Sequence, residues 1–192
     1  MMKKSVGKLA SIALLAGATA GSTLAADAPE TITVSSSAFD HHGTVPLENT
    51  AYGDGDSPQL TWTNLPEGTE ELALIMDDPI APTPEPFVHW VAYNIPASAT
   101  GLMSGLPTDA EFLAEGLEGM TNGVNGIGRT GYFGPRPPAD DKLHAYHFRV
   151  YALDEDLDLP AGLNKTQLLE AMEGHVLATG MLMGHYQQME GQ

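Results

Sequence analysis

Residues 144–153, HAYHFRVYAL, carry the clearest β-strand pattern in this chain. Side chains two residues apart lie on the same face of a strand, so this segment has two distinct faces. One face carries His144, Tyr146, Phe148 and Val150, and the other carries His147, Arg149 and Tyr151. His144 and Tyr146 would lie about 6–7 Å apart along the strand, which lets both tips reach one ligand.

Other segments of the chain also have an extended pattern. They are Thr31–Ser37, Gln59–Thr63, the apolar run Leu72–Met76, and Phe87–Ile95, with Val176–Tyr186 extended or mixed. In Phe87–Ile95, strict alternation predicts that every second residue from Phe87 to Ile95, His89 included, shares one face. Many short strands with few helices indicate a mainly β domain resembling a sandwich.

Two short helices are expected. Asn164 is a helix N-cap, because Gln167 follows three residues later as in a capping box. This helix would end near Glu173, before Gly174. Ala110–Glu118 is the other candidate, inside a glycine-rich stretch that otherwise looks like a loop.

The N-terminus has the layout of a secretory signal peptide. Lys3, Lys4 and Lys8 precede an apolar stretch from Leu9 to Ala20, and small residues then offer a cleavage site after Ala25 or Ala26. The stretch is too short and too rich in glycine for a membrane anchor. We therefore expect residues 1–25 to be removed, residues 26–192 to form one domain, and the protein to be periplasmic or secreted.

The composition excludes several partners. Residues 26–192 hold five of the eight basic residues and all 25 acidic ones, a formal charge of 5 − 25 = −20. Such a chain is repelled by nucleic acid and by anionic membranes. Its acidity is typical of a surface suited to high salt, where screening relieves self-repulsion. The absence of cysteine excludes disulfides, and no metal site or cofactor is expected, since the adjacent His41 and His42 diverge on an extended chain.

Polar residues recur beside glycine and proline turns, in an order that resembles a known family. The motifs are Asp78-Pro79-Ile80-Ala81-Pro82, His89-Trp90, Gly134-Pro135-Arg136-Pro137-Pro138 and His144-Ala145-Tyr146-His147-Phe148. Together they closely resemble the phosphatidylethanolamine-binding protein family, with the bacterial branch called Raf kinase inhibitor-like as the nearest match. The resemblance runs from about Phe39 to Tyr186.

The resemblance implies a large central antiparallel sheet packed against a smaller sheet, with helices near the C-terminus. It also implies a shallow anion pocket at one end of the large sheet. The family's ligand-binding positions correspond here to Asp78, His89, His144 and Tyr146, with Gly134 and Pro135 shaping the rim. Family members bind phosphate, acetate-like anions or phospholipid head groups, and some inhibit kinases or proteases.

Two residues depart from the family pattern. Ile80 replaces the second acid of the usual Asp-Pro-Asp motif, which should favour an anion over a cationic amine. Arg136 stands where a small residue or cysteine is usual, so its guanidinium would either clamp an anion or pair with a surface acid. We expect Asp78 to orient a histidine imidazole and keep it protonated. His89 is the histidine nearest to it in sequence.

Three classes of function follow. The leading hypothesis is a non-catalytic protein that binds a small anionic or phosphorylated ligand, more tightly at mildly acidic pH. The alternative is an inhibitor that docks onto a protease, kinase or host protein. A hydrolase using Asp78, His89 and His144 is the third, but the sequence has no nucleophile elbow, so water would be the only nucleophile.

Overall fold

A computed structural model describes residues 28–140 and 142–189. The expected signal peptide, residues 1–25, lies outside them. The described chain is mainly β, with a single α-helix and a short 3-10 helix, Leu47–Asn49. The strands are β1 (Thr33–Ser35), β2 (Gly43–Thr44), β3 (Leu60–Thr63), β4 (Glu71–Asp78), β5 (Phe87–Pro96), β6 (Gly101–Leu102), β7 (Thr121–Asn122), β8 (His144–Leu153) and β9 (Val176–Tyr186). The helix is α1, Lys165–Ala171.

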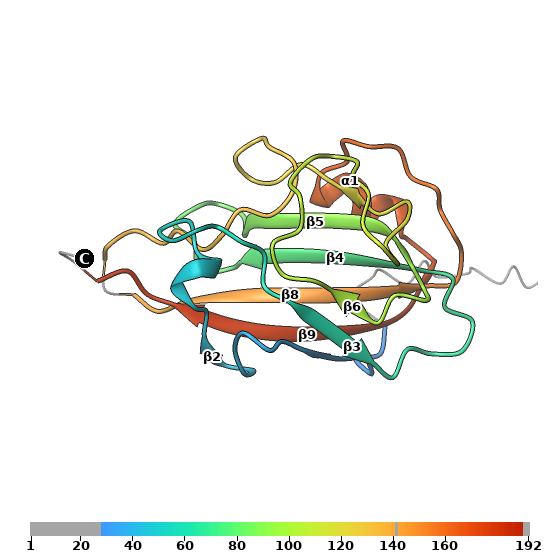
Figure 1. The fold of residues 1–192 in the computed structure, drawn as a ribbon, viewed down its shortest axis with the longest axis horizontal. Coiled ribbons are helices and arrows are strands. Elements are labelled where there is room, and N and C mark those ends of the chain that lie inside the picture. Colours follow the sequence, from blue (N-terminus) through green and yellow to red (C-terminus); the bar gives the residue numbers. More distant parts are fainter. Residues whose placement is uncertain (1–27, 141, 190–192) are drawn as a thin grey trace, which may run out of the picture.

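The strands form two sheets (Figure 1). The larger has six strands in the order β2-β9-β8-β4-β5-β7, and the smaller has three in the order β1-β3-β6. Neighbours are antiparallel except β2, which pairs parallel to β9 through Gly43 with Gly184 and Thr44 with His185. The six-stranded sheet is therefore mixed, and the expectation of a purely antiparallel architecture was wrong at this edge.

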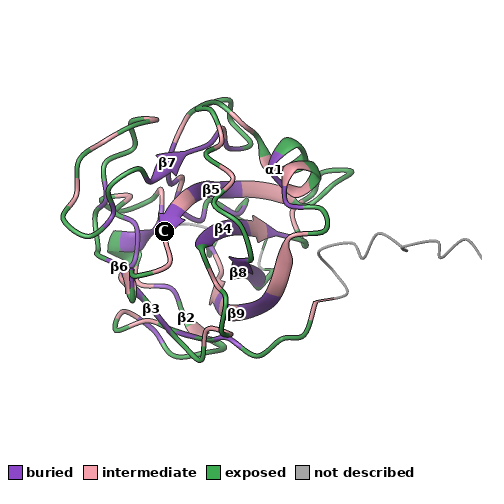
Figure 2. Ribbon diagram, turned by 90° about the vertical axis from the view of Figure 1, so that its right-hand side faces the viewer, coloured by how far each residue is buried: buried purple, intermediate pink, exposed green. Residues whose placement is uncertain are grey.

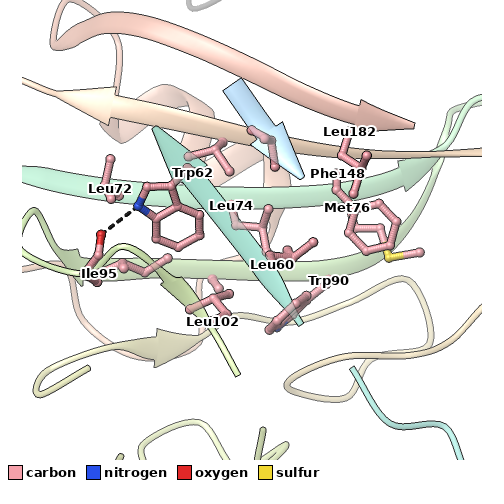
Figure 3. Close-up of a cluster of buried hydrophobic side chains, with 14 of the residues drawn as sticks. Leu60, Trp62, Leu72, Leu74, Met76, Trp90, Ile95, Leu102, Phe148 and Leu182 are labelled. Atoms are coloured by element: carbon pink, nitrogen blue, oxygen red, sulfur yellow. Dashed lines mark hydrogen bonds between the residues drawn. The ribbon is translucent and has the colours of Figure 1, made fainter. Parts of the chain in front are cut away.

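The two sheets share the larger hydrophobic core. Val34, Leu60 and Trp62 of the small sheet belong to the same buried cluster as Leu74 and Phe148 of the large one (Figure 3). The indole N–H of Trp62 donates to the carbonyl of Ala99 at 2.7 Å, so the one polar atom of this side chain is satisfied inside the core. Burial is concentrated in the central strands, and most loops are exposed (Figure 2).

The opposite face of the large sheet carries a smaller buried cluster beneath α1. Ile75, Val91 and Tyr93 of the sheet pack there with Leu168 of the helix. Asn164 caps α1 by accepting from the N–H of Gln167, and the Gln167 side chain accepts from the N–H of Asn164. The predicted capping box is therefore confirmed. No helix in the described part of the chain is long and apolar enough to cross a membrane.

Two other expectations about secondary structure were wrong. Ala110–Glu118 is not helical, because its backbone pairs with β7 instead. Glu111 forms a β-bridge with Thr121, and the N–H of Asn122 donates to the carbonyl of Ala110. The strict alternation expected in Phe87–Ile95 also fails. Trp90, Ala92 and Ile95 lie in the larger core, whereas Val91 and Tyr93 lie in the smaller cluster.

The alternation fails because β5 contains irregularities in its pairing with β4. Met76 pairs with Trp90 and Asp77 with Val88, which leaves His89 as an extra, unpaired residue. Such a bulge bends a strand and re-aims one side chain. As a result, His89 shares the side of the sheet used by its neighbour Trp90, at the edge of the larger core.

Candidate functional site

A cavity of about 450 Å³ lies at the end of the large sheet where β4 ends and β5 and β8 begin. Because the three strands are antiparallel neighbours, Asp78, His89 and His144 come together from distant positions in the sequence. We call this the His144 cavity. Its walls are completed by Tyr52, Ala81, Pro82, Thr83, Phe87, Ile127, Phe133, Arg136, Pro137, Pro138 and Tyr146.

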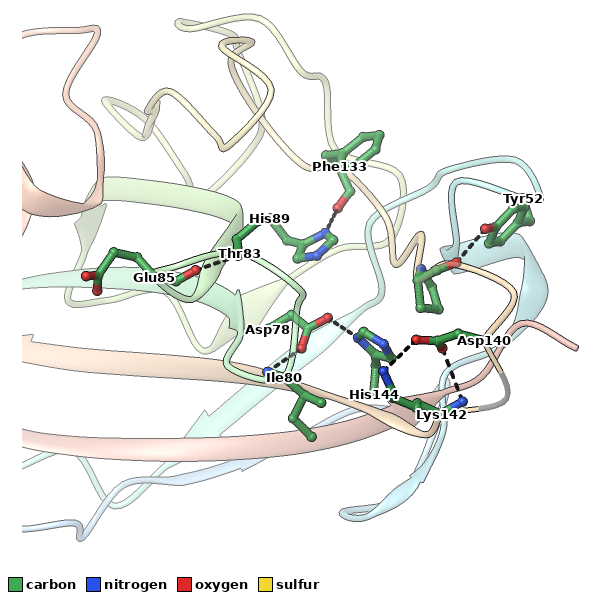
Figure 4. A network of polar contacts seen from close by, with 11 residues as sticks. Tyr52, Asp78, Ile80, Thr83, Glu85, His89, Phe133, Asp140, Lys142 and His144 are labelled. Carbon is green, nitrogen blue, oxygen red and sulfur yellow. Dashed lines mark hydrogen bonds and ion pairs between the residues drawn. The ribbon is translucent and has the colours of Figure 1, made fainter.

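A buried hydrogen bond between two side chains forms one side of the cavity. The Nδ1–H of His144 donates to Oδ2 of Asp78 at 2.6 Å, and both side chains are almost fully buried. The other carboxylate oxygen accepts from the N–H of Ile80 at 2.9 Å (Figure 4). Both oxygens of Asp78 are therefore engaged, and the histidine is held with Nε2 as its free atom.

Two buried polar atoms of the site have no partner in the described structure. They are Nε2 of His144 and the hydroxyl of Tyr146. Both residues project from the same face of β8, as the sequence predicted, and both line the His144 cavity. Leaving such groups unsatisfied typically costs about 1–3 kcal/mol each, so a ligand that bonds to both would recover that cost.

His89 has a different environment from His144. Its Nδ1–H donates to the carbonyl of Phe133 at 2.7 Å, and its ring stacks on Phe133 with centroids 5.7 Å apart. Burial lowers the pKa of His89, although the carbonyl of Phe133 and the charge of Asp78 oppose this shift. The ring is therefore neutral at neutral pH, and the imidazole that Asp78 orients is not that of His89, its neighbour in sequence. Asp78 pairs with His144 instead.

Tyr146 is a neutral hydrogen-bond donor throughout the physiological range. Burial raises the pKa of its phenol well above the ordinary value, and the charge of Asp78 raises it further. The ring lies edge-on to His89, with centroids 5.2 Å apart. The hydroxyl can therefore donate to an anion without becoming charged itself.

Gly134 and Pro135 are not among the lining residues of the cavity, and they position the loop that follows them. A Cβ on Gly134 would lie 2.7 Å from the backbone nitrogen of Ala51, so only glycine allows the two loops to approach this closely. The carbonyl of Pro135 accepts from that same nitrogen at 3.0 Å. One residue on, the hydroxyl of Tyr52 donates to the carbonyl of Pro137 at 2.6 Å. These contacts hold the loop that forms the cavity's outer wall.

Arg136 and Ile80 differ in their relation to the cavity. Arg136 is exposed and lines the cavity, and it makes no ion pair with any residue that the structure describes. Ile80 is half-exposed and is not among the lining residues, although its N–H binds Asp78. An isoleucine in place of an acid at this position therefore changes the charge close to Asp78, but it does not change the residues that line the cavity.

Sequence reasoning missed the aromatic part of the wall. Phe87 and Phe133 flank His89, with the Phe87 ring 4.9 Å from it between centroids, and Tyr52 contributes from a loop far away in sequence. Phe133 directly precedes Gly134, so proximity to a known motif was the one available signal. Within residues 28–140 and 142–189, no group of three His, Asp or Glu side chains is arranged to hold a metal ion.

Comparison with known proteins connects this geometry to one family. Residues 35–187 match the family model described as phosphatidylethanolamine-binding protein. A protein of Methanothermobacter thermautotrophicus named UPF0098 protein is 45% identical over 151 residues, covering 79% of this chain and 95% of the relative. The UPF0098 protein of Aquifex aeolicus is 38% identical over 156 residues, covering 81% and 88%.

Two solved structures have the same fold. The PEBP homolog CT736 of Chlamydia trachomatis superposes with a TM-score of 0.73 at 34% identity, covering 83% of this chain and 99% of its own. Escherichia coli YbcL, described as a new member of the mammalian PEBP family, gives a TM-score of 0.72 at 30% identity, covering 82% and 99%.

Proposed function

This chain belongs to the phosphatidylethanolamine-binding protein family, and from that premise we propose that it is an exported, non-catalytic binding protein whose His144 cavity takes a small anion. Phosphate, or the phosphate of a phosphorylated head group, is the ligand chemistry we favour. One observation carries the proposal: Nε2 of His144 and the hydroxyl of Tyr146 are buried without a partner among the described residues, and both residues line one cavity.

The geometry around His144 favours an anion that arrives together with a proton. Nδ1–H is committed to Asp78, so Nε2 alone faces the ligand. An anion oxygen and a bare Nε2 lone pair repel each other, so one proton must sit between them, on the ring or on the ligand. The charge of Asp78 also opposes an anion unless that proton is present. Binding should therefore be linked to proton uptake and weaken as pH rises.

Arg136 supports an anionic ligand from the mouth of the cavity. Its guanidinium has no carboxylate partner among the described residues, so it is available for a bidentate contact with phosphate or carboxylate. The half-exposed Ile80 near the mouth offers nothing to the ammonium group of ethanolamine. We therefore place the anionic part of a head group, rather than its amine, at the centre of recognition.

The absence of catalysis is part of the proposal. A hydrolase here would need a nucleophile beside the Asp78–His144 pair, and the one hydroxyl of a Ser or Thr among the lining residues, that of Thr83, donates to the carbonyl of Glu85. Water would be the remaining nucleophile. Turnover of a phosphoester by the purified protein that is lost in His144→Gln would contradict this part.

Titration calorimetry with inorganic phosphate at pH 6 tests the anion site. Tyr146→Phe removes a hydroxyl that has no hydrogen-bond partner in the described part of the chain, so it should keep or raise stability yet weaken phosphate binding about tenfold. His144→Gln should weaken binding at least as much. His147→Gln is the matched control, because His147 lies on the same strand but faces the opposite side. No saturable heat with the unchanged protein would refute the proposal.

Export is proposed from the N-terminal sequence and needs its own measurement. After expression with the full chain, mass spectrometry of the periplasmic or secreted fraction should show a protein that begins after Ala25 or Ala26. Recovery of protein that still begins at its first residues, from the cytoplasm alone, would remove this part of the proposal and leave the anion site untouched.

A second candidate function is docking onto a protein partner, which is favoured by exposed apolar side chains in and near the His144 cavity. Two of its lining residues, Tyr52 and Ile127, are exposed large apolar side chains. Two more lie close in sequence to lining residues: Ile80 is two residues after Asp78, and Leu143 directly precedes His144. Exposed apolar groups around a polar centre are typical of interaction surfaces. Capture of a periplasmic or secreted protein by the native chain, abolished in Ile127→Asp but not in Leu113→Asp, would favour it.

A further inference from the structure

A second, larger cavity lies on the other side of the six-stranded sheet. It measures about 590 Å³ and is bounded by β4, β8 and β9 on one side and α1 on the other. We call it the Arg149 cavity. It shares no lining residue with the His144 cavity, because side chains alternate along each strand: Asp77 and His147 face this side, whereas Asp78 and Tyr146 face the other.

Arg149 lines this cavity and has no anionic partner among the residues that the structure describes. It lies in the middle of β8, opposite Ile75 of β4 and Met181 of β9. Its Nη2 donates to the sulfur of Met181 at 3.3 Å, which is a weak acceptor for a group with five N–H donors. No carboxylate in the described chain lies within ion-pair distance of it. In so acidic a protein, an arginine left without a carboxylate at the base of a cavity indicates a site for an anion.

The neighbouring charges limit which anion fits. The ammonium of Lys165 forms an ion pair with Asp77, so these two charges largely cancel. His147 lies 4.0 Å from Asp77, and its pKa is lowered by burial and by the charge of Arg149, although Asp77 opposes this. Glu170 and Glu173 line the exposed rim on the helix side. One uncompensated positive charge beneath an acidic rim favours a single negative charge over a dianion.

The rest of the lining suits an apolar body. Tyr151 is buried and lies on the same face of β8 as Arg149, two residues further on. Leu169 of α1 is half-buried and packs against the smaller core cluster on the facing wall. The volume falls within the range of about 300–1,000 Å³ that is usual for small-molecule sites.

We propose that the Arg149 cavity binds a small monocarboxylate with an apolar, ring-sized body. The carboxylate makes a bidentate contact with the guanidinium of Arg149, whose planar fork matches its geometry. The body of the ligand packs between Tyr151 and Leu169. This site is independent of the function proposed above, since it lies on the opposite side of the sheet and uses other residues.

Phenylacetate is the probe that tests the proposal, with phenethylamine as its counterpart of equal size and opposite charge. The titrations are carried out in phosphate buffer, so that phosphate already competes with phenylacetate for any site that binds anions in general. We expect saturable binding of phenylacetate and none of phenethylamine. Arg149→Gln should weaken phenylacetate binding at least about tenfold, as expected for loss of a charge-assisted hydrogen bond. Arg136→Gln removes the same charge from the His144 cavity, and it should change the affinity for phenylacetate by less than about twofold.

Amide chemical shifts of the unchanged protein provide a measurement that no variant's folding can disturb. Phenylacetate should shift the amides of Arg149, Tyr151 and Leu169 and leave those of His89 and His144 unchanged. Shifts centred on His89 and His144, equal binding of phenethylamine, or unchanged affinity in a folded Arg149→Gln variant would each overturn the proposal.

Discussion

At the scale of single residues, the buried Glu71 governs part of the pH dependence of stability. Its carboxylate accepts from the N–H of Asn94 at 3.1 Å and from that of Leu157 at 2.9 Å. Burial nevertheless raises the pKa of Glu71 from 4.5 to about 7, and the nearby Asp156 adds to the shift. The folded protein therefore holds this proton more tightly than the unfolded chain does.

We predict that Glu71 makes the protein less stable as pH rises from about 4.5 to about 7. In that window the folded state binds the extra proton, so the free energy of unfolding falls with rising pH. Between pH 5 and pH 7.5 the Glu71 contribution should fall by on the order of 1–2 kcal/mol, since solvent around the exposed Asp156 screens part of the effect.

Urea unfolding at both pH values, in the unchanged protein and in Glu71→Gln, measures this contribution. The variant should lose less stability than the unchanged protein over the same interval. Glu70→Gln removes the same charge from the exposed neighbouring residue and should behave like the unchanged protein. Equal pH dependence in Glu71→Gln and Glu70→Gln would contradict the assignment.

The residues of the candidate site show what the sequence can and cannot predict. Asp78, His89, His144 and Tyr146 were expected from the family resemblance, and all four do line one cavity. The partner of Asp78 was not predictable in this way. β4 lies between β5 and β8, so a histidine approaches Asp78 from either side, and the bulge in β5 turns His89 toward Phe133.

At the scale of elements, long strands were predicted better than short segments. His144–Leu153 is a strand over its whole predicted length, because one strong alternation decides it. β2 has only two residues, and its parallel pairing with β9 depends on the path of the whole chain, which no local pattern encodes. Ala110–Glu118 has a sequence compatible with a helix, yet contacts with β7 prevail over that weak propensity.

We predict that Gly134→Ala disturbs two loops at once. The added Cβ would lie 2.7 Å from the carbonyl carbon of Thr50 and from the nitrogen of Ala51, both of them backbone atoms that cannot rotate away. The loop after Gly134 must therefore shift, at a cost of about 1–3 kcal/mol, which is usual for overpacking. Phosphate binding should weaken as well, because the same loop carries Arg136 and Pro137 into the cavity wall.

Thermal unfolding and phosphate titration of Gly134→Ala test both consequences. Arg136→Ala is the control for stability: it truncates an exposed side chain in the same loop without crowding the backbone, so its stability should change by less than about 0.5 kcal/mol. A Gly134→Ala protein with unchanged stability and unchanged phosphate affinity would show that the close approach of the two loops is unimportant.

At the scale of the whole molecule, the dominant feature is uncompensated negative charge. The formal charge of residues 26–192 is 5 − 25 = −20. Few of the basic residues neutralise it: Lys142 pairs with Asp140 and Lys165 with Asp77, while the three arginines have no carboxylate partner among the described residues. Repulsion among surface acids therefore opposes the compact state, and screening by salt should relieve it.

We predict that the melting temperature rises by about 2–8 °C between low salt and about 1 M salt, as expected for on the order of 1–2 kcal/mol gained in a domain of this size. Sodium chloride and tetramethylammonium chloride should act almost equally, because screening depends on ionic strength and not on the cation. A rise with sodium alone would instead indicate a specific cation site among the acids. A melting temperature that falls or stays constant in both salts would show that surface repulsion is not what limits the stability of this protein.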